Sequence, residues 1–236
     1  MNFEEKSIFE EGQLLLFDKP LYWTSFDLVN KIRGMIRSNL GIKKLKVGHA
    51  GTLDPLATGL MIICTGKLTK KIEEFSNLDK EYIATIHLGE TTPSFDLETE
   101  PDGKYPTDHI TFELVQEVLK RFLGEQNQMP PLYSAKFIDG KRAYEYARKG
   151  IDKKLESVKI SFRDIELIDF RLPDIRVRLV CSKGTYIRSF ARDFGKALKS
   201  GAYLSALQRS SIGGYRLNES WDVEKFQLFL RQMQHT

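Results

Sequence analysis

The sequence contains little sulfur and little histidine. Its 236 residues include only two cysteines, Cys64 and Cys181, and four histidines. Two cysteines cannot build a disulfide framework, and neither lies at metal-ligand spacing from the scattered histidines. We therefore expect no metal site, and we expect reduced thiols in the cytoplasm.

Long apolar runs are also missing. No stretch of about 18 apolar residues exists, which excludes a membrane-spanning helix. The N-terminal segment, residues 1–6, reads Met-Asn-Phe-Glu-Glu-Lys and lacks the apolar core of a signal peptide. The sequence also shows no internal repeat and no low-complexity linker. With 41% hydrophobic and 29% charged residues, it has the composition of an ordinary globular chain. Its length suits one large domain or one domain with a small appendage, and we expect a single domain over residues 1–236.

Several enzyme signatures are absent. Gly66-Lys67 resembles the end of a phosphate-binding loop, but Met61 and Leu68 stand where that motif needs glycine and Ser or Thr. No nucleophile-elbow sequence marks a serine hydrolase. A glycosidase with two catalytic carboxylates stays open as an alternative. However, only one acid, Asp54, lies in an unusual motif, and no second acid does so.

The charge is mild in total but gathered in blocks. There are 36 basic and 32 acidic residues, a net charge of +4. No acid occurs from Leu28 to Leu53. Three blocks hold basic residues: Lys31, Arg33, Arg37, Lys43, Lys44 and Lys46; Lys136, Lys141, Arg142, Arg148, Lys149, Lys153 and Lys154; and Lys183, Arg188, Arg192, Lys196 and Lys199. Such blocks indicate either a face that binds a polyanion or ordinary solvated helix surfaces.

Hydrophobic periodicity predicts strands and helices in irregular alternation, typical of an α+β fold around a mixed, mostly antiparallel sheet. Thr24 or Ser25 caps a helix with Phe26, Val29, Ile32 and Ile36 on its apolar face. The other expected helices are 112–122 (with Phe112 apolar), 144–148, 186–198 (ended by Gly201) and 223–233. The expected strands are 14–17, 60–64, 81–88, 158–167, 175–181 and a pair within 204–215, and the expected loops are 48–59 and 126–140.

The segment Gly48–Gly59 is the most unusual. It reads Gly-His-Ala-Gly-Thr-Leu-Asp-Pro-Leu-Ala-Thr-Gly, and its glycines allow the backbone to approach a ligand closely. Pro55 restricts Asp54, so that its carboxylate is held in a tight loop. Two interpretations stay open: a catalytic carboxylate that acts as acid, base or nucleophile, or a structural Asx-turn.

A second dense segment runs from Cys181 to Ser189. Gly184 turns the chain after a strand, and Arg188 falls in the first turn of the next helix. An arginine there either pairs with a carboxylate or lies on the surface of the helix.

With these motifs the sequence closely resembles the TruB family of bacterial tRNA pseudouridine synthases. Five segments between Leu14 and Tyr215 carry the resemblance: Leu14–Pro20; Gly48–Gly59; Lys80–Ala84 with Leu88, Gly89 and Asp96; Pro130–Ala135 with Gly140 and Tyr144–Arg148; and Cys181–Arg188 with Leu207 and Arg209. The resemblance implies a pseudouridine synthase fold with an RNA-binding cleft. It implies conversion of uridine 55 in the T-loop of tRNA to pseudouridine, without a cofactor.

The resemblance also implies roles for single residues. Asp54 corresponds to the catalytic aspartate, as nucleophile or as base at the sugar. Tyr82 would stack on the base and help to move the C5 proton. Arg188 would pair with Asp54 and keep it ionised.

Five further residues are implied to bind the substrate or support the site. His49 would hold the rearranged stack after the base flips out, or make a structural hydrogen bond. Lys19 would support the loop or contact RNA. Asp96 would bond within the site or to a basic side chain, Tyr186 would lie near the substrate, and Leu207 would pack in the base pocket.

The resemblance finally sets expectations for organisation and partners. Residues 126–154 correspond to an RNA-clasping insertion, whose lysines would bind phosphates. Only 21 residues (236 − 215) follow Tyr215, so no C-terminal PUA domain is expected. We expect a monomer that binds the T-arm of tRNA with no guide RNA, protein partner or membrane. Two alternatives are a guide-RNA-dependent relative and a tRNA-folding chaperone without catalysis.

Overall fold

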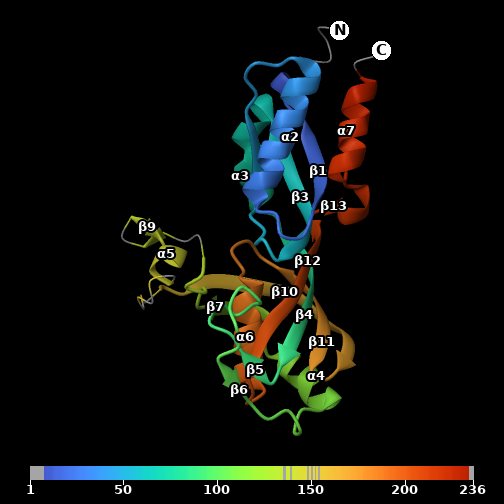
Figure 1. Cartoon of the computed structure of the whole chain (residues 1–236). Coiled ribbons are helices and arrows are strands. Elements are labelled where there is room, and N and C mark those ends of the chain that lie inside the picture. Colours follow the sequence, from blue (N-terminus) through green and yellow to red (C-terminus); the bar gives the residue numbers. More distant parts are fainter. Residues whose placement is uncertain are drawn as a thin grey trace. The chain divides into compact units, whose positions relative to one another are not determined.

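The computed structural model describes residues 8–134, 137–138, 140–147, 149, 151, 153 and 155–233. Contacts between residues divide the chain into two compact units, one combining Met1–Glu81 with Gln208–Thr236 and the other formed by Tyr82–Leu207 (Figure 1). The chain passes between the units inside two strands, β4 (Lys80–Leu88) and β12 (Ala202–Ile212). The single-domain boundary expected from the sequence stays a prediction.

The sheet of the first unit is built around β3 (Ala57–Thr65). β3 pairs antiparallel with β1 (Leu14–Lys19) on one side and with β2 (Val47–Ala50) on the other. The order β1-β3 continues to β12, which pairs with β13 (Tyr215–Arg216). β3 is buried at almost every position, as expected for an apolar strand that is covered on both faces.

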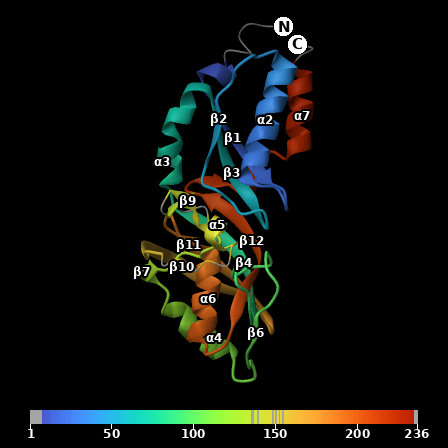
Figure 2. The same ribbon diagram turned by 60° about the vertical axis from the view of Figure 1, so that its left-hand side comes forward.

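Helices cover this sheet. α2 (Ser25–Leu40) and α7 (Val223–Gln232) contact each other and lie side by side in Figures 1 and 2. Phe17 of β1 meets Phe226 of α7 edge to face, with ring centroids 5.0 Å apart. The short helices η1 (Gly66–Lys71), α3 (Ile72–Ser76) and η2 (Leu217–Glu219) complete the unit. One part of its core consists of Ala50, Leu60, Ile62, Cys64 and Ile212.

The sequence of α2 determines where the helix starts. The Thr24 side chain accepts a hydrogen bond from the Asp27 backbone, and the Asp27 carboxylate accepts one from Thr24 N at 2.8 Å. This reciprocal capping box confirms the predicted start. The predicted apolar face is correct except for Phe26, which is 64% exposed because Leu28 and Met35 complete the buried face instead.

The loop predicted from Gly48 to Gly59 is shorter than expected. Gly48 belongs to β2 and Gly59 to β3, which leaves residues 51–56 as the connection. A Cβ added to Gly48 would lie 2.6 Å from Ile72 Cδ1, and one added to Gly59 would lie 2.4 Å from the Arg209 carbonyl oxygen. Gly48 therefore permits close packing of α3 on β2, and Gly59 permits the close approach of β12 to β3.

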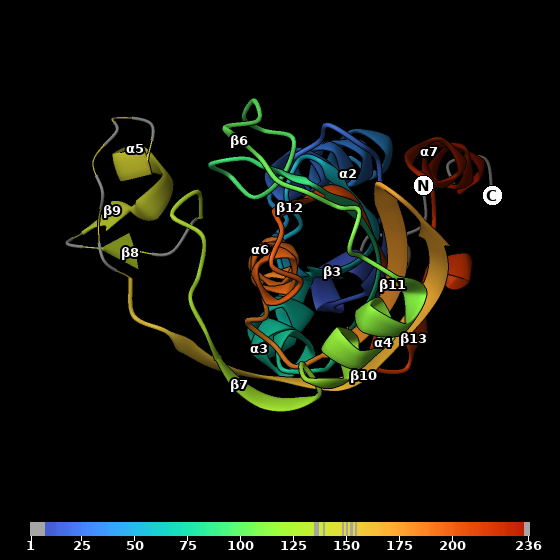
Figure 3. The same ribbon diagram turned by 90° about the horizontal axis from the view of Figure 1, so that it is seen from below.

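The second unit holds the strand order β12-β4-β11-β10-β7. β10 (Val158–Arg171) and β11 (Asp174–Cys181) form the antiparallel hairpin that the alternation predicts. In β4, Tyr82, Ala84, Ile86 and Leu88 are buried as expected. The predicted loop 126–140 is wrong at its start, because β7 (Gly124–Gln128) pairs antiparallel with β10 (Figure 3). It is also wrong near its end, where Phe137–Ile138 forms a short strand.

Helices α4 (Phe112–Lys120), α5 (Ala143–Ala147) and α6 (Ile187–Ala197) lie in this unit, with two short strand pairs. These pairs are β5 (Glu90–Thr91) with β6 (Gly103–Lys104), and β8 (Phe137–Ile138) with β9 (Lys141–Arg142). Rings stabilise the packing of α6, since Phe190 lies 5.1 Å from both Phe122 and Phe162. The arrangement is the expected α+β fold with a mostly antiparallel sheet.

Two details of the predicted helices are wrong. α6 ends at Ala197, and Lys199 (φ 56°) takes the left-handed conformation, not Gly201. Gly201 serves packing, because a Cβ there would lie 2.4 Å from the Tyr105 ring. Phe112 is 43% exposed at the start of α4.

Some expectations fall on residues outside the description. These are the acidic residues 1–6 at the N-terminus and Lys136, Arg148 and Lys154 of the second basic block. Among the residues that are described, no helix combines the length and the hydropathy needed to cross a bilayer.

Glycines of the first unit give a paired stability prediction. Gly34 is exposed inside α2, and no atom lies within 4 Å of the position that an added Cβ would take, so Gly34→Ala should raise the free energy of unfolding by about 0.5–1 kcal/mol. Gly59 has φ 105° and faces the Arg209 backbone, so Gly59→Ala should lower it by at least about 2 kcal/mol. Urea denaturation of both variants tests this, and equal effects would contradict the packing assigned to Gly59.

Candidate active-site residues

The backbone that precedes Asp54 is anchored by two buried side chains. The Arg209 guanidinium donates to the Gly51 carbonyl at 3.0 Å. The Ser25 hydroxyl accepts from Leu53 N at 2.8 Å and donates to the Leu53 carbonyl at 3.0 Å. Both backbone groups of the residue before Asp54 are therefore satisfied by one side chain.

The backbone at and after Asp54 is fixed as well. The Asp54 carbonyl accepts from Ala57 N at 3.0 Å, and the Pro55 carbonyl accepts from Tyr22 N at 2.8 Å. Asp54 itself is half-buried. A carboxylate on a connection held at this many points is suited to a reaction that needs a fixed geometry.

Lys19 lies fully buried at the end of β1. Its ammonium donates to the carbonyls of Pro20 at 2.9 Å and Trp23 at 2.6 Å. Burial lowers the pKa of Lys19 to about 8, and the nearby charge of Asp54 partly opposes that shift. These contacts place Lys19 beneath the turn that leads into α2, where it can support the Asp54 loop; its role stays a prediction.

His49 lies on β2, and only Ala50, the last residue of that strand, separates it from the loop. Burial lowers its pKa, the charge of Arg209 lowers it further, and a hydrogen bond to the Gly51 backbone opposes both. The imidazole is therefore neutral at pH 7. Its Nδ1 atom is buried and has no hydrogen-bond partner among the residues that the structure describes.

Two residues of this site were not assigned roles from the sequence. Arg209, only 1% exposed, also donates from Nε to the Leu60 carbonyl at 2.7 Å. The resemblance included Arg209, but an arginine in an alternating strand gives no sign of complete burial. Ser25 was considered only as a helix cap, and its partner Leu53 lies 28 residues away.

In the second unit, Arg188 and Asp96 form a buried ion pair. Arg188 Nε lies 3.5 Å from Asp96 Oδ2, with both side chains about 5–6% exposed. Arg188 also donates to the Ser94 carbonyl at 3.3 Å. Arg188 thus begins α6 as predicted but is no surface arginine. Its implied pairing with Asp54 stays a prediction.

The segment around Asp96 is strongly ordered. Asp96 Oδ1 accepts from Glu98 N at 2.9 Å, and its carbonyl accepts from the hydroxyls of Thr92 at 2.7 Å and Ser94 at 3.1 Å. Leu204 N bonds to the Phe95 carbonyl and joins this segment to β12. The Asp96 carboxylate is therefore well placed to fix the Arg188 guanidinium.

Tyr186 is the N-cap residue of α6 and is held by a residue that the sequence did not reveal. The Gln128 side chain accepts from Tyr186 N at 2.8 Å and donates to the Tyr186 carbonyl at 3.1 Å. Of the remaining predicted residues, Tyr82 is 8% exposed on β4 and Leu207 is half-buried on β12. The roles predicted for these residues stay predictions.

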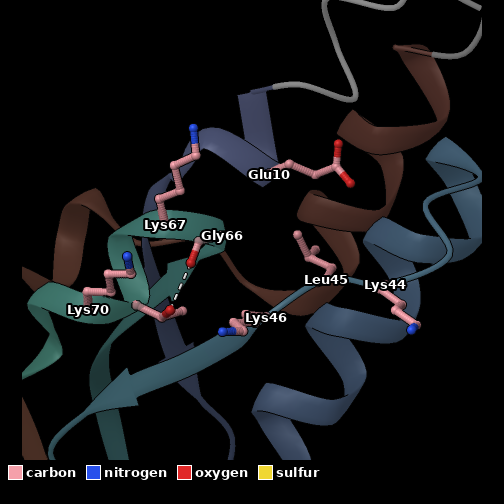
Figure 4. A pocket seen from close by; sticks show the side chains of 8 residues that line it. Glu10, Lys44, Leu45, Lys46, Gly66, Lys67 and Lys70 are labelled. Carbon is pink, nitrogen blue, oxygen red and sulfur yellow. Dashed lines mark hydrogen bonds between the residues drawn. The ribbon is translucent and has the colours of Figure 1, made fainter.

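A basic cavity lies at the other end of β2 and β3 from the Asp54 loop. Its volume is about 260 Å³, and Lys44, Lys46, Lys67 and Lys70 line it together with Glu10 (Figure 4). The four residues of β2 separate the cavity from the start of the loop by about 13–16 Å, and the nine residues of β3 separate it from the end of the loop by about 30 Å. Within the described residues no group of acids, histidines and cysteines is arranged to hold a metal.

Solved structures share this fold. The chain of a Cbf5–Nop10–Gar1 complex matches 97% of this chain with a TM-score of 0.71 and 26% identity. An H/ACA ribonucleoprotein bound to a substrate RNA containing 2'-deoxyuridine matches 100% with a TM-score of 0.68 and 22% identity. This chain spans 58% of each of those chains. The class is therefore the pseudouridine synthase fold.

Sequence comparison narrows the class to a family. Residues 37–187, more than half of the chain, match the profile of the TruB family pseudouridylate synthase (N terminal domain). Proteins named tRNA pseudouridine synthase B are 60% identical over 96% of both chains in Phocaeicola vulgatus and 53% identical over 92% of this chain and 95% of the relative in Flavobacterium johnsoniae. The chain belongs to the TruB family.

The lowered pKa of Lys19 predicts a pH-dependent stability. Because the pKa is about 8 in the folded chain and 10.5 is the ordinary value for lysine, the unfolded chain holds more protons between these values. The contribution of Lys19 to folding stability is therefore least favourable below pH 8 and rises with pH from 8 to 10.5. Urea denaturation should show this rise in the wild type and its loss in Lys19→Met; parallel profiles would contradict it.

The buried Arg188–Asp96 ion pair of the second unit predicts a large loss of stability when one carboxylate oxygen of Asp96 is replaced. Asp96→Asn keeps the shape but leaves the Arg188 charge buried beside a neutral group, which should cost about 3 kcal/mol of unfolding free energy. Asp169→Asn is the matched control, since its partner Arg171 is 82% exposed and the pair should contribute less than about 1 kcal/mol. Equal losses in denaturant titrations would show that the Asp96 pair is not tightly buried.

Proposed function

We propose that this chain isomerises uridine 55 in the T-loop of tRNA to pseudouridine. The bond from ribose C1′ to uracil N1 breaks, the base turns, and a bond from C1′ to C5 forms. The proton on C5 leaves and N1 gains one, so that the reaction is balanced without an oxidant, a reductant or a co-substrate.

Family membership and the identity to proteins named tRNA pseudouridine synthase B support this proposal. The single structural observation that carries it is the fixation of the backbone around Asp54. Arg209, Ser25 and Tyr22 hold Gly51, Leu53 and Pro55 by hydrogen bonds of 2.8–3.0 Å. A turn that needed only to reverse the chain would not need three anchors from distant segments.

In the proposed reaction Asp54 is the reacting carboxylate, as nucleophile or as base at the sugar. Tyr82 stacks on the uracil and assists the transfer of the C5 proton. Arg188, oriented by Asp96 through the 3.5 Å ion pair, is the cation that pairs with the Asp54 carboxylate. Asp96 is thus a positioning residue.

The remaining residues bind or support the substrate. His49, neutral at pH 7, occupies the place that the flipped base leaves in the stack. Leu207 packs against the uracil, Tyr186 lies near it, and Lys19 supports the loop from below. The lysines of residues 126–154 and of the basic cavity bind phosphates of the T-arm.

The proposal includes the state of the protein in the cell. We propose a monomer in the reducing cytoplasm that needs no protein partner or guide RNA. Cys64 and Cys181 are both buried and form no disulfide in the described part of the chain, and burial raises the pKa of Cys64 to about 11. Both cysteines are thus suited to a structural role as thiols.

Replacement of Asp54 tests the proposal directly. Asp54→Asn retains the size of the side chain but cannot act as nucleophile or base. It should lower the single-turnover rate on an unmodified tRNA transcript by roughly 10³-fold or more while tRNA still binds. Pseudouridine is mapped at single-nucleotide resolution, and binding is measured by filter retention.

The exposed Asp108→Asn is the matched control and should react as the wild type does. Tight tRNA binding by a wild-type protein that forms no pseudouridine would overturn the catalytic proposal in favour of a folding chaperone. Equal product from wild type and Asp54→Asn would remove only the role of Asp54.

A further inference from the structure

Two exposed aromatic residues, Tyr22 and Phe26, belong to the segment that anchors the Asp54 loop through Tyr22 N–H and the Ser25 hydroxyl. Tyr22 is 74% exposed and Phe26 is 64% exposed. Tyr22 is bonded directly to the loop, because its N–H donates to the carbonyl of Pro55, the residue after Asp54. All of these residues belong to the first unit. An aromatic surface therefore adjoins the candidate catalytic loop.

The backbone conformation of Tyr22 indicates that its side chain does not serve the stability of the fold. Its φ of 67° lies in the left-handed region, which glycine adopts without strain and a bulky residue only at a cost. Its ring is mostly in solvent and contributes little packing. Glycine would adopt this backbone conformation without strain. We therefore expect the phenol ring to have a role other than stabilising the turn.

Phe26 continues the surface along α2. Residues 26, 30, 33 and 37 follow helical spacing and share one face of the helix, which carries Asn30, Arg33 and Arg37 after the aromatic ring. The Nε atom of Arg33 is buried and lacks a hydrogen-bond partner within the described part of the chain. The acid that follows Phe26 in the chain, Asp27, accepts hydrogen bonds from the backbone N–H and the hydroxyl of Thr24.

We propose that Tyr22 and Phe26 form a platform on which unpaired bases of the RNA substrate stack, while Arg33 and Arg37 contact the adjoining phosphates. This inference rests on the proposed function and extends it to residues outside the catalytic set. Removal of a base from a folded loop exposes the faces of its neighbours, and aromatic rings accept any such face. Interleaved aromatic and basic side chains are typical of surfaces that bind unpaired RNA.

The charge of the face favours RNA over an apolar protein segment. No acid occurs from Leu28 to Leu53, so the part of α2 that follows Phe26 contributes the basic side chains Lys31, Arg33 and Arg37 and no acid. A docking site for an apolar helix would continue with apolar residues at positions 30, 33 and 37. The platform also leads directly to the loop that holds Asp54.

Because the backbone of Tyr22 is strained, its replacement by glycine should weaken tRNA binding without lowering the stability of the fold. Tyr22→Gly and Phe26→Ala should each raise the Kd for an unmodified tRNA transcript roughly tenfold. Tyr22→Gly should unfold at the same or a higher temperature than the wild type, since the strain is relieved. Tyr22→Trp should retain binding, because it restores an aromatic face.

Salt dependence separates stacking from phosphate contact. The aromatic variants should show the wild-type slope of log Kd against log salt, whereas Arg33→Gln should reduce the slope by about one. Leu228→Ala is the matched control, since Leu228 is an apolar residue on α7 of the same unit and is 56% exposed. Its tRNA affinity should equal that of the wild type.

The outcome is independent of the test of Asp54. If the wild type forms pseudouridine and both aromatic variants bind tRNA as the wild type does, the platform is overturned and the proposed function stands. If the wild type forms none but the aromatic variants still lose affinity, the platform stands as an RNA-binding surface. A loss of affinity that Leu228→Ala shares would also overturn it.

Discussion

The burial of one guanidinium, that of Arg209, is the constraint on which the first unit depends. It donates to carbonyls on both sides of the Asp54 loop, at Gly51 before it and at Leu60 after it. Its backbone also fills the space beside Gly59. A buried charge is tolerated only when hydrogen bonds compensate for the lost water, so the loop and the arginine require each other. Burial lowers the pKa of His49 and of Lys19, and the charge of Arg209 adds to both shifts.

Local chemistry made much of the fold predictable. The capping box of α2, the alternation of β4 and the β10–β11 hairpin each follow from short stretches of sequence. The errors have a common cause, namely partners that are distant in the chain. β7 was expected to be a loop because its polar sequence becomes a strand only by pairing with β10, and Phe26 was placed inside because periodicity does not show which flank of a helix is covered.

The site was predictable in its residue types but not in its support. The motif around Asp54 and the resemblance supplied the eight candidate residues. They did not reveal that Ser25 satisfies both backbone groups of Leu53, or that Gln128 does the same for Tyr186. Such side-chain-to-backbone bonds leave no periodic signal in a sequence, because any buried polar residue at the right distance can make them. They appear only when the tertiary structure is known.

The order of residues along the chain has a consequence for synthesis on the ribosome. The loop with Asp54 is made early, but the arginine that anchors it lies 155 residues later (209 − 54), beyond the whole of the second unit. At ordinary elongation rates this delay is roughly ten to thirty seconds. Throughout that time the nascent segment lacks β12, β13 and α7, so its apolar strand β3 can pair with β1 and β2 but not with β12. The reacting centre is therefore assembled last, when the final segment of the chain returns to the first.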